Sequence, residues 1–422
     1  MFWRVCTLHL SCLLTITMCL SNSAAGVWHD VGRRGFSVVW NMPTSRCEHR
    51  YGVLLPLQKY GIIYNVQQRF LGENISLFYE RRLGLYPYVK HQDLINGGIP
   101  QGGSLEGHLA LAENQLRVRL RKNFKGLAVL DWEAWQPLWR QNYGRRKVYK
   151  KLSKQFVRER FPEMSEEDVT SLAKLEFEQE ARAFMEETLQ LGVHVCPRGL
   201  WGFYGFPGCY NYHGAKHSGY TGQCKPSTEM MNDRLAFLWQ HSTALYPSVY
   251  VSRRLAGHPN TRLMMRHRIL EALRVAFQHA TRSHPIPVLP YARVAFIHTL
   301  QFLNQTDLEH TLGEAAALGA AGVVLWGELR FAKSKEQCAL LRDYISSVLG
   351  VYVEALNRGT VRCSERVCHG NGRCARRNPH SGHMIPMLQN ETEPAQDLRS
   401  QFRCMCYEGW RGAQCENTTK RV

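Results

Sequence analysis

The chain has 422 residues, of which 44% are hydrophobic and 21% are charged. These proportions are typical of a folded globular protein and exclude a disordered chain, a collagen and a coiled coil. Lysine and arginine number 53 against 35 aspartate and glutamate residues, so the formal net charge is +18. Such an excess attracts polyanions, among them nucleic acid, anionic lipid and acidic polysaccharide, and charge alone does not choose among the three.

The first 25 residues have the features of a secretory signal peptide. Arg4 precedes an apolar run over residues 5–20, and the small residues that follow predict cleavage near Ala25. A short uncleaved anchor is the alternative, but the run is short for a bilayer span. Without a later apolar segment or a hydrophobic tail, the sequence predicts no membrane anchor and a secreted or lysosomal protein.

Cysteines and glycosylation sequons indicate the same oxidising compartment. Three of the 14 cysteines lie in the signal segment, and the other 11 allow five disulfides and one free thiol. Four Asn-x-Ser/Thr sequons predict glycosylation at Asn74, Asn304, Asn390 and Asn417.

Short apolar runs alternate with amphipathic stretches from about residue 35 to residue 355. The runs are rich in β-branched and aromatic residues and are bounded by Gly, Pro or Asn, as is typical of strands. They span residues 36–41, 60–65, 76–80, 127–133, 200–206, 247–251, 287–296 and 322–328. Helices are expected over residues 164–192, with Ser165 as N-cap and Gly192 after the last turn, and over 232–245, 261–280 and 335–356.

This alternation favours an α/β fold in which helices cover a parallel sheet. About eight repeats predict a closed, TIM-like (β/α) barrel over residues 26–358. An open doubly wound sheet is the alternative. No glycine-rich dinucleotide or phosphate loop follows the first strand, so the sequence predicts no nucleotide cofactor.

Residues 359–417 form a second, cysteine-rich part. Six cysteines have the spacing C-x4-C-x5-C-x29-C-x-C-x8-C, and the ending CMCYEGWRGAQC resembles an epidermal-growth-factor-like (EGF-like) module with a long insert. That resemblance implies the pairs Cys363–Cys374, Cys368–Cys404 and Cys406–Cys415. A zinc site is the alternative, but a secreted chain favours disulfides.

Two acids at the end of the fourth expected strand are the strongest catalytic candidates. LAVLDWEAW places Asp131 and Glu133 two residues apart, so a strand would put both on one face with Cα atoms about 6.5–7 Å apart. The carboxyl end of a barrel strand faces the substrate. Two neighbouring carboxyl groups do not both ionise easily, and the protonated one can act as a general acid. Trp132 and Trp135 could raise its pKa or stack on a sugar; the alternative is a surface pair of acids.

Other polar and aromatic side chains recur at expected strand ends. They are Asn41, Tyr79, Tyr204, Tyr250 and Trp326. Aromatic rings at a cleft suit carbohydrate, and basic stretches at 117–125, 145–151 and 265–268 suit an acidic polymer, although a solvated helix face is the simpler reading of each. The 18 histidines show no paired metal-ligand spacing on one helix, so no metal site is predicted.

Six motifs follow one another along the chain: GLAVLDWEAW, GLWGFYGFPGCYNY, GYTGQC, ALYPSVY, GAAGVVLW and CHGNGRCARR. They closely resemble motifs of the hyaluronidase family, glycoside hydrolases of vertebrate tissues and insect venoms, and most of all its soluble lysosomal or secreted vertebrate members. The resemblance covers about residues 36–416. It implies a distorted (β/α) barrel that hydrolyses β-1,4 bonds between N-acetylglucosamine and glucuronate in hyaluronan, with chondroitin as a further substrate. We expect a monomer with no cofactor and no nucleic-acid partner; the partner of the EGF-like module is left open.

The same resemblance implies a retaining, substrate-assisted mechanism. Glu133 matches the general acid/base, and the acetamido oxygen of the substrate is the nucleophile. Asp131 would orient the acetamide group and stabilise the charge that develops on it. Tyr204 and Tyr250 would line the acetamide pocket, and Trp326 would close its floor.

Further positions are assigned only by this resemblance. Asn41, Tyr79 and Arg268 match cleft residues, and Arg268 would pair with a substrate carboxylate. The implied barrel disulfides are Cys47–Cys338 and Cys209–Cys224, with Cys196 unpaired.

The chain departs from the family pattern at two places beside the cleft. Gly208 stands where many active members have Asp, and Ile297 and His298 stand where active members often carry an acid. A weaker negative field would lower the pKa of Glu133 and shift the pH profile. Two functions follow: an active hyaluronidase, or a secreted hyaluronan-binding protein with weak or no hydrolysis. A chitinase-like enzyme, a third reading, leaves the +18 charge unexplained.

Overall fold

The computed structural model describes residue 32 and residues 35–280, 284–387 and 395–419. The signal peptide expected at residues 1–25 and the sequon at Asn390 lie outside these residues. Within the described part of the chain, no helix is long and apolar enough to cross a membrane.

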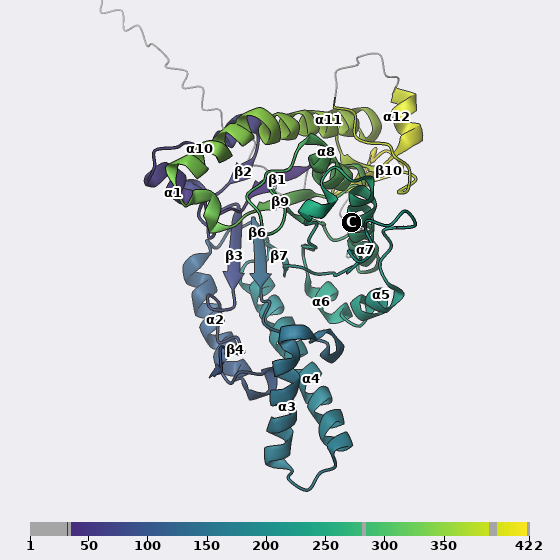
Figure 1. Cartoon of the computed structure of the whole chain (residues 1–422). Helices are drawn as coiled ribbons and strands as arrows, with labels where there is room; N and C mark the ends of the chain where they lie inside the picture. The colour runs from purple at the N-terminus through teal and green to yellow at the C-terminus, as the bar shows by residue number, and fades with distance from the viewer. Residues whose placement is uncertain (1–31, 33–34, 281–283, 388–394, 420–422) are drawn as a thin grey trace, which may run out of the picture.

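Parallel strands form the centre of the larger part (Figure 1). One sheet has the order β2-β1-β9-β8 and a second has the order β3-β6-β7, and all neighbouring strands in both are parallel. The strands are β1 (Ser37–Trp40), β2 (Ile63–Tyr64), β3 (Ile75–Tyr79), β6 (Leu127–Asp131), β7 (Leu200–Phe203), β8 (Tyr291–Arg293) and β9 (Gly322–Trp326). An antiparallel pair, β4 (Tyr88–Lys90) and β5 (Asp93–Ile95), lies outside these sheets.

The strand expected at residues 247–251 is replaced by isolated bridges. Parallel bridges join Tyr204 to Tyr246 and Ser248 to Tyr291, so this segment connects β7 with β8. Pro247 has no N–H group to donate to a neighbouring strand, which limits the ladder here. The prediction of a continuous strand was therefore wrong, while the predicted position between its neighbours was correct.

Helices surround the strands (Figure 1). They are α1 (Ser45–His49), α2 (Leu105–Arg119), α3 (Lys147–Arg160), α4 (Glu166–Val195), α5 (Pro226–Asp233), α6 (Ala236–His241), α7 (Pro259–Gln278), α8 (Gln305–Leu308), α9 (Glu314–Ala317), α10 (Lys335–Tyr344), α11 (Gly350–Cys368) and α12 (Ala395–Gln401). A π-helical segment joins α8 to α9, and another joins α10 to α11. The hairpin of α3 and α4 extends away from the strands at the bottom of Figure 1.

The alternation of side chains along each strand separates an inner cluster from the helix-covered faces. Val39, Val129 and Val324 belong to the inner cluster, whereas Leu130 and Leu325 belong to the large cluster that also contains helix residues. Successive strand residues point to opposite faces, so this pattern places the last residue of each strand on a predictable side.

The C-terminal part is attached to the helical layer. Strands β10 (Gly372–Arg376) and β11 (Phe402–Cys406) pair antiparallel, as do β12 (Trp410–Arg411) and β13 (Asn417–Thr418). Helix α11 continues past residue 358, so the domain boundary expected there lies inside one helix. The structure has the five disulfides that the resemblances implied: Cys47–Cys338, Cys209–Cys224, Cys363–Cys374, Cys368–Cys404 and Cys406–Cys415. Cys196 is free and buried.

Candidate active site

The ends of the parallel strands bring the predicted side chains together. Tyr79, the last residue of β3, is in register with Asp131, the last residue of β6. Tyr204 follows β7, and its N–H group donates to the Leu130 carbonyl at 2.9 Å. Tyr79, Tyr204 and Trp326 all pack against the inner cluster. The strand register therefore collects side chains from segments that are far apart in the sequence.

Asp131 is a buried carboxyl group with unused hydrogen-bonding capacity. It is 9% exposed, and its Oδ1 atom is buried without a hydrogen-bond partner in the described part of the chain. Burial raises the pKa of Asp131 to about 8, and the charges of Glu133 and Glu80 act in the same direction. A neutral Asp131 at acid pH follows from this environment.

Glu133 lies two residues beyond the end of β6, where the strand expected over residues 127–133 has already ended. Its side chain is exposed. Desolvation by the surrounding protein raises the pKa of Glu133, Arg146 opposes that effect, and Glu80 adds to it. The site thus holds a buried acid beside an accessible acid, both with raised pKa values.

Three aromatic side chains form a wall beside the two acids. The Tyr204 hydroxyl donates to the Tyr250 hydroxyl at 3.0 Å. The rings of Tyr250 and Trp326 are stacked with centroids 6.4 Å apart and an interplanar angle of 24°. Burial, together with Asp131 and Glu133, raises the pKa of Tyr79 to about 12, while a hydrogen bond from Trp326 acts in the opposite direction. These phenols stay protonated and can donate hydrogen bonds at any working pH.

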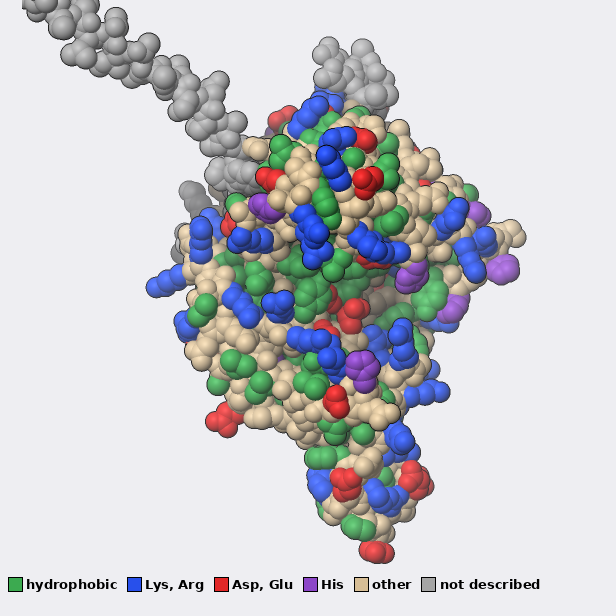
Figure 2. Space-filling view, turned by 60° about the vertical axis from the view of Figure 1, so that its left-hand side comes forward, with side chains coloured by type: hydrophobic (Ala, Val, Ile, Leu, Met, Phe, Trp, Pro, Cys, Tyr) green, Lys and Arg blue, Asp and Glu red, His purple; other side chains and the backbone are tan. Residues whose placement is uncertain are grey.

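A cavity of about 870 Å³ opens beside this wall, and Tyr250, Trp326 and Arg268 line it. Arg268 is held by the protein, since its Nε donates to Asn211 Oδ1 at 2.9 Å and its Nη1 donates to the Ser248 carbonyl at 3.1 Å. Figure 2 shows a hollow across one face of the molecule, with hydrophobic and acidic side chains inside it and lysine and arginine side chains around it.

Sequence reasoning missed Arg293, which also lines this cavity. It is the last residue of β8, it pairs with Glu328 at 2.8 Å, and its guanidinium lies 5.0 Å from the Trp326 ring centroid. Its position at a strand end in PVLPYARVAF is the signal that could have identified it, because the same rule selected Tyr79 and Trp326.

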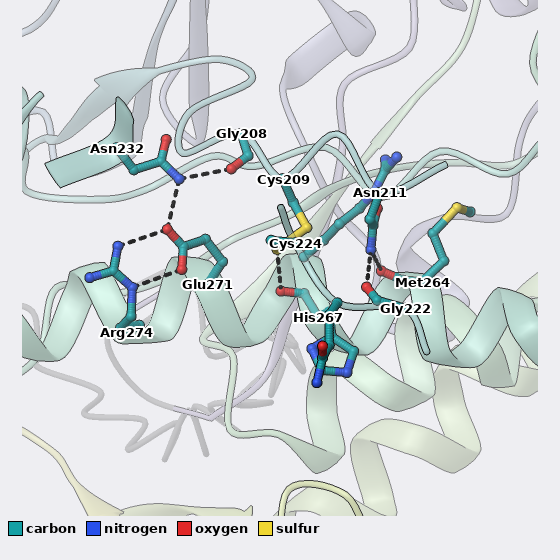
Figure 3. Close-up of a disulfide and its surroundings, with 12 residues drawn as sticks. Gly208, Cys209, Asn211, Gly222, Cys224, Asn232, Met264, His267, Glu271 and Arg274 are labelled. Atoms are coloured by element: carbon teal, nitrogen blue, oxygen red, sulfur yellow. Dashed lines mark hydrogen bonds and ion pairs between the residues drawn. A yellow bond between two sulfur atoms is a disulfide. The ribbon is translucent and has the colours of Figure 1, made fainter. Parts of the chain in front are cut away.

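The loop that carries Gly208 is fixed from several sides (Figure 3). The Cys209–Cys224 disulfide closes it, and Asn232 Nδ2 donates both to the Gly208 carbonyl at 2.8 Å and to Glu271 at 2.7 Å. A Cβ atom on residue 208 would lie 2.9 Å from the Tyr210 ring. The Tyr210 ring therefore occupies the space into which an acid at position 208 would project.

The structure changes the roles expected for two tryptophans. Trp132 and Trp135 are 3% and 2% exposed and pack against Tyr86 with ring centroids 4.6 and 4.9 Å away. The expectation that they stack on a sugar was wrong, because the loop around Tyr86 covers them. Asn41 is also buried, with Nδ2 donating to the Tyr291 hydroxyl at 3.0 Å, and the Tyr291 ring contacts the Tyr204 ring edge-on at 5.0 Å.

The sequons differ in accessibility. Asn74 is buried, with 9% of its surface exposed, and its Nδ2 donates to the Tyr64 carbonyl at 2.8 Å. Asn304 and Asn417 are exposed. A glycan at Asn74 would need the surrounding packing to open, while the other two described positions have room for one.

Comparison with known proteins agrees with this geometry. The family model described as hyaluronidase matches residues 27–419. The chain belongs to the hyaluronidase family. Hyaluronidase-3 of Mus musculus is 44% identical over 412 residues, covering 97% of this chain and 98% of that one, and hyaluronidase-1 of Homo sapiens is 38% identical over 404 residues, covering 91% and 92%. The crystal structure of bee venom hyaluronidase in complex with a hyaluronic acid tetramer superposes with a TM-score of 0.69 at 34% identity, covering 76% of this chain and 98% of that one.

Proposed function

We propose that this hyaluronidase-family chain hydrolyses the β-1,4 bonds between N-acetylglucosamine and glucuronate in hyaluronan. The similar bee venom hyaluronidase was crystallised in complex with a hyaluronic acid tetramer, and the +18 net charge of this chain suits an anionic polymer. The fold we propose for this activity is a distorted (β/α) barrel with an EGF-like module. Five disulfides favour an oxidising compartment, so we place the protein in the secretory pathway, extracellular or lysosomal.

One observation carries the proposal: a buried carboxyl oxygen without a partner next to an accessible carboxyl group. Asp131 Oδ1 is an acceptor that no described group satisfies, and a buried polar atom of this kind gains by binding a donor from a ligand. The acetamide N–H of N-acetylglucosamine is such a donor. Glu133 is exposed and can reach a glycosidic oxygen that is bound beside it.

The proposed mechanism uses the substrate as its own nucleophile. Glu133 donates its proton to the leaving oxygen while the acetamido oxygen attacks C1 and forms an oxazolinium ring. Asp131 accepts the acetamide N–H through its unpartnered oxygen, which orients the acetamido oxygen toward C1 and places the carboxyl dipole beside the positive charge of that ring. Glu133, now a carboxylate, takes a proton from a water molecule that opens the ring with retained configuration. Tyr204 and Tyr250 surround the acetamide group, and Trp326 supports it from below.

A second candidate, a hyaluronan-binding protein with weak hydrolysis, is favoured by Gly208. No acid projects from this position, and the Tyr210 ring fills the space instead. Desolvation by the surrounding protein nevertheless raises the pKa of Glu133, and this direction favours the protonated acid that the first step needs. We therefore prefer the enzyme. Chondroitin, as a second substrate, would use the same site, and nothing in the proposed mechanism needs more than one copy of the chain.

The size of hyaluronan after incubation with purified protein tests this proposal. The wild-type protein should shorten the polymer at acid pH, and Glu133→Gln should bind it with similar affinity but leave its length unchanged. Removing a general acid of this kind lowers kcat by about 100-fold or more. Retention of hyaluronan by both proteins without shortening by either would favour the binding protein instead.

A further inference from the structure

Arg146 contacts the main chain of Glu133. Its Nε and Nη2 atoms donate to the Glu133 carbonyl oxygen at 3.1 and 2.9 Å. Arg146 ends a single 3-10 turn, Gly144–Arg146, immediately before α3, and its side chain is half-buried. Gly144 has a φ of 61°, a left-handed conformation that glycine adopts without strain, and it starts this turn. The turn thus directs the guanidinium back toward the end of β6.

We propose that Arg146 is a positioning residue for Glu133: its guanidinium fixes the main chain at the acid and keeps a positive charge beside the carboxyl group. This inference rests on the proposed role of Glu133 as acid/base. Glu133 lies just outside β6 and lacks the strand ladder that holds Asp131. Two hydrogen bonds from one planar group to one carbonyl oxygen replace that support and restrict the orientation of the residue.

The electrostatic surroundings of Glu133 contain opposing charges. Glu80, which follows β3, raises the pKa of Glu133, and Arg146 lowers it. Glu80 is half-buried and forms no ion pair within the described part of the chain. The charge of Glu133 also raises the pKa of three neighbouring groups, which are Asp131 of β6, Tyr79 of β3 and Tyr204 after β7. Asp131 is neutral in acid and both phenols stay neutral, so the charges that act on Glu133 come from Arg146 and Glu80.

The sign of the effect follows from the proposed mechanism. Glu133 must be protonated for the first step, so kcat/KM falls as the pH rises through the pKa of Glu133. Loss of the Arg146 charge raises that pKa and moves the basic limb of the profile to higher pH. Loss of the Glu80 charge lowers the pKa and moves the same limb to lower pH.

The test compares pH profiles of hyaluronan shortening for Arg146→Gln, Arg146→Lys and Glu80→Gln. Arg146→Gln should shift the basic limb upward and lower kcat by roughly ten- to a hundredfold, because the acid is no longer held in place. Arg146→Lys keeps the positive charge but lacks the planar guanidinium group. The basic limb of the pH profile should therefore stay near its wild-type position while kcat falls. Glu80→Gln should shift the limb downward. Arg140→Gln, at an exposed arginine six residues away, is the matched control and should leave the profile unchanged.

An unchanged basic limb in a folded Arg146→Gln protein would overturn the proposal, as would an equal shift in Arg146→Lys. Thermal unfolding checks that each variant is folded. A direct titration keeps the test independent of activity: ¹³C NMR of labelled glutamate carboxyl groups, with the Glu133 signal assigned by its loss in Glu133→Gln. If the wild-type protein does not shorten hyaluronan, the proposed function fails, and the same titration still decides whether Arg146 lowers the pKa of Glu133.

Discussion

At the scale of single residues, Asp131 and Glu133 are two carboxyl groups with different surroundings. Asp131 ends a buried strand and has little contact with water, and burial raises its pKa to about 8. Glu133 lies two residues further on and is exposed. A neutral buried acid can bind an amide without the cost of a desolvated charge, while an accessible acid can exchange its proton with substrate and water. The division of roles follows from where the strand ends.

The raised pKa of Asp131 predicts a pH-dependent stability. The folded chain holds this proton up to about pH 8, whereas the ordinary aspartate pKa of 3.8 applies to the unfolded chain. Between these limits the folded state binds more protons, so the free energy of unfolding falls as the pH rises. Asp131→Asn removes this dependence. Its Tm relative to wild type should therefore increase steadily from pH 4 to pH 8.

Thermal unfolding at several pH values measures this difference. Asp93→Asn, at an exposed position of β5, reports the effect of removing a surface carboxylate. A Tm difference between Asp131→Asn and wild type that is the same at every pH would show that Asp131 is ionised in the folded protein.

The sequence predicted several residues that lie at strand ends, although it missed Arg293 at the end of β8, and it missed Arg146, whose position depends on a loop. One rule predicted Tyr79, Asp131 and Trp326 as site residues: polar and aromatic groups at the carboxyl ends of parallel strands lie close together. A 3-10 turn, Gly144–Arg146, brings Arg146 to Glu133, and the hydrophobic periodicity of the sequence does not predict this turn. The burial of Trp132 depends on Tyr86, which comes from a segment 46 positions earlier in the sequence.

At the scale of elements, packing explains where the predictions of helices succeeded and failed. The N-terminus of α4 is correct: Ser165 is the N-cap, and its hydroxyl accepts the Asp168 N–H. The end is wrong, because the helix continues past Gly192 to Val195. A Cβ atom on Gly192 would lie 2.7 Å from the buried Trp201 ring. This glycine therefore permits close approach of α4 to β7 and does not end the helix.

At the scale of the whole molecule, a buried ion cluster joins the C-terminal part to the larger part. Glu314 of α9 is fully buried and pairs with Arg376 of β10 at 2.9 Å and with Arg266 of α7 at 2.7 Å. Arg266 also donates to the His380 and Ser381 carbonyls. Burial by itself would raise the pKa of Glu314, but these arginines lower it overall. The carboxylate therefore remains charged and links the two parts.

Removal of this charge should destabilise the entire protein. Glu314→Gln leaves two buried guanidinium groups without a counter-charge, and breaking a buried ion pair in this way costs about 3–5 kcal/mol. Denaturant unfolding measures the loss. Glu354→Gln breaks the exposed Glu354–Arg358 pair on α11 and is the matched control, with an expected cost below about 1 kcal/mol.

If Glu314→Gln loses no more stability than Glu354→Gln, the two parts are not coupled through this cluster. If it is destabilised, limited proteolysis should cut the C-terminal part of the variant faster than that of the wild type, because the same cluster holds the loop that contains His380.

In the proposed mechanism, Glu133 acts with the substrate's own acetamide group while Asp131 orients that group. The most direct measurement is the anomeric configuration of the first reducing end released from hyaluronan oligosaccharides, followed by ¹H NMR before mutarotation. We expect the β-anomer, which retains the configuration of the cleaved bond, from the wild-type protein and no product from Glu133→Gln. Initial release of the α-anomer, or product formation by Glu133→Gln at the wild-type rate, would contradict it.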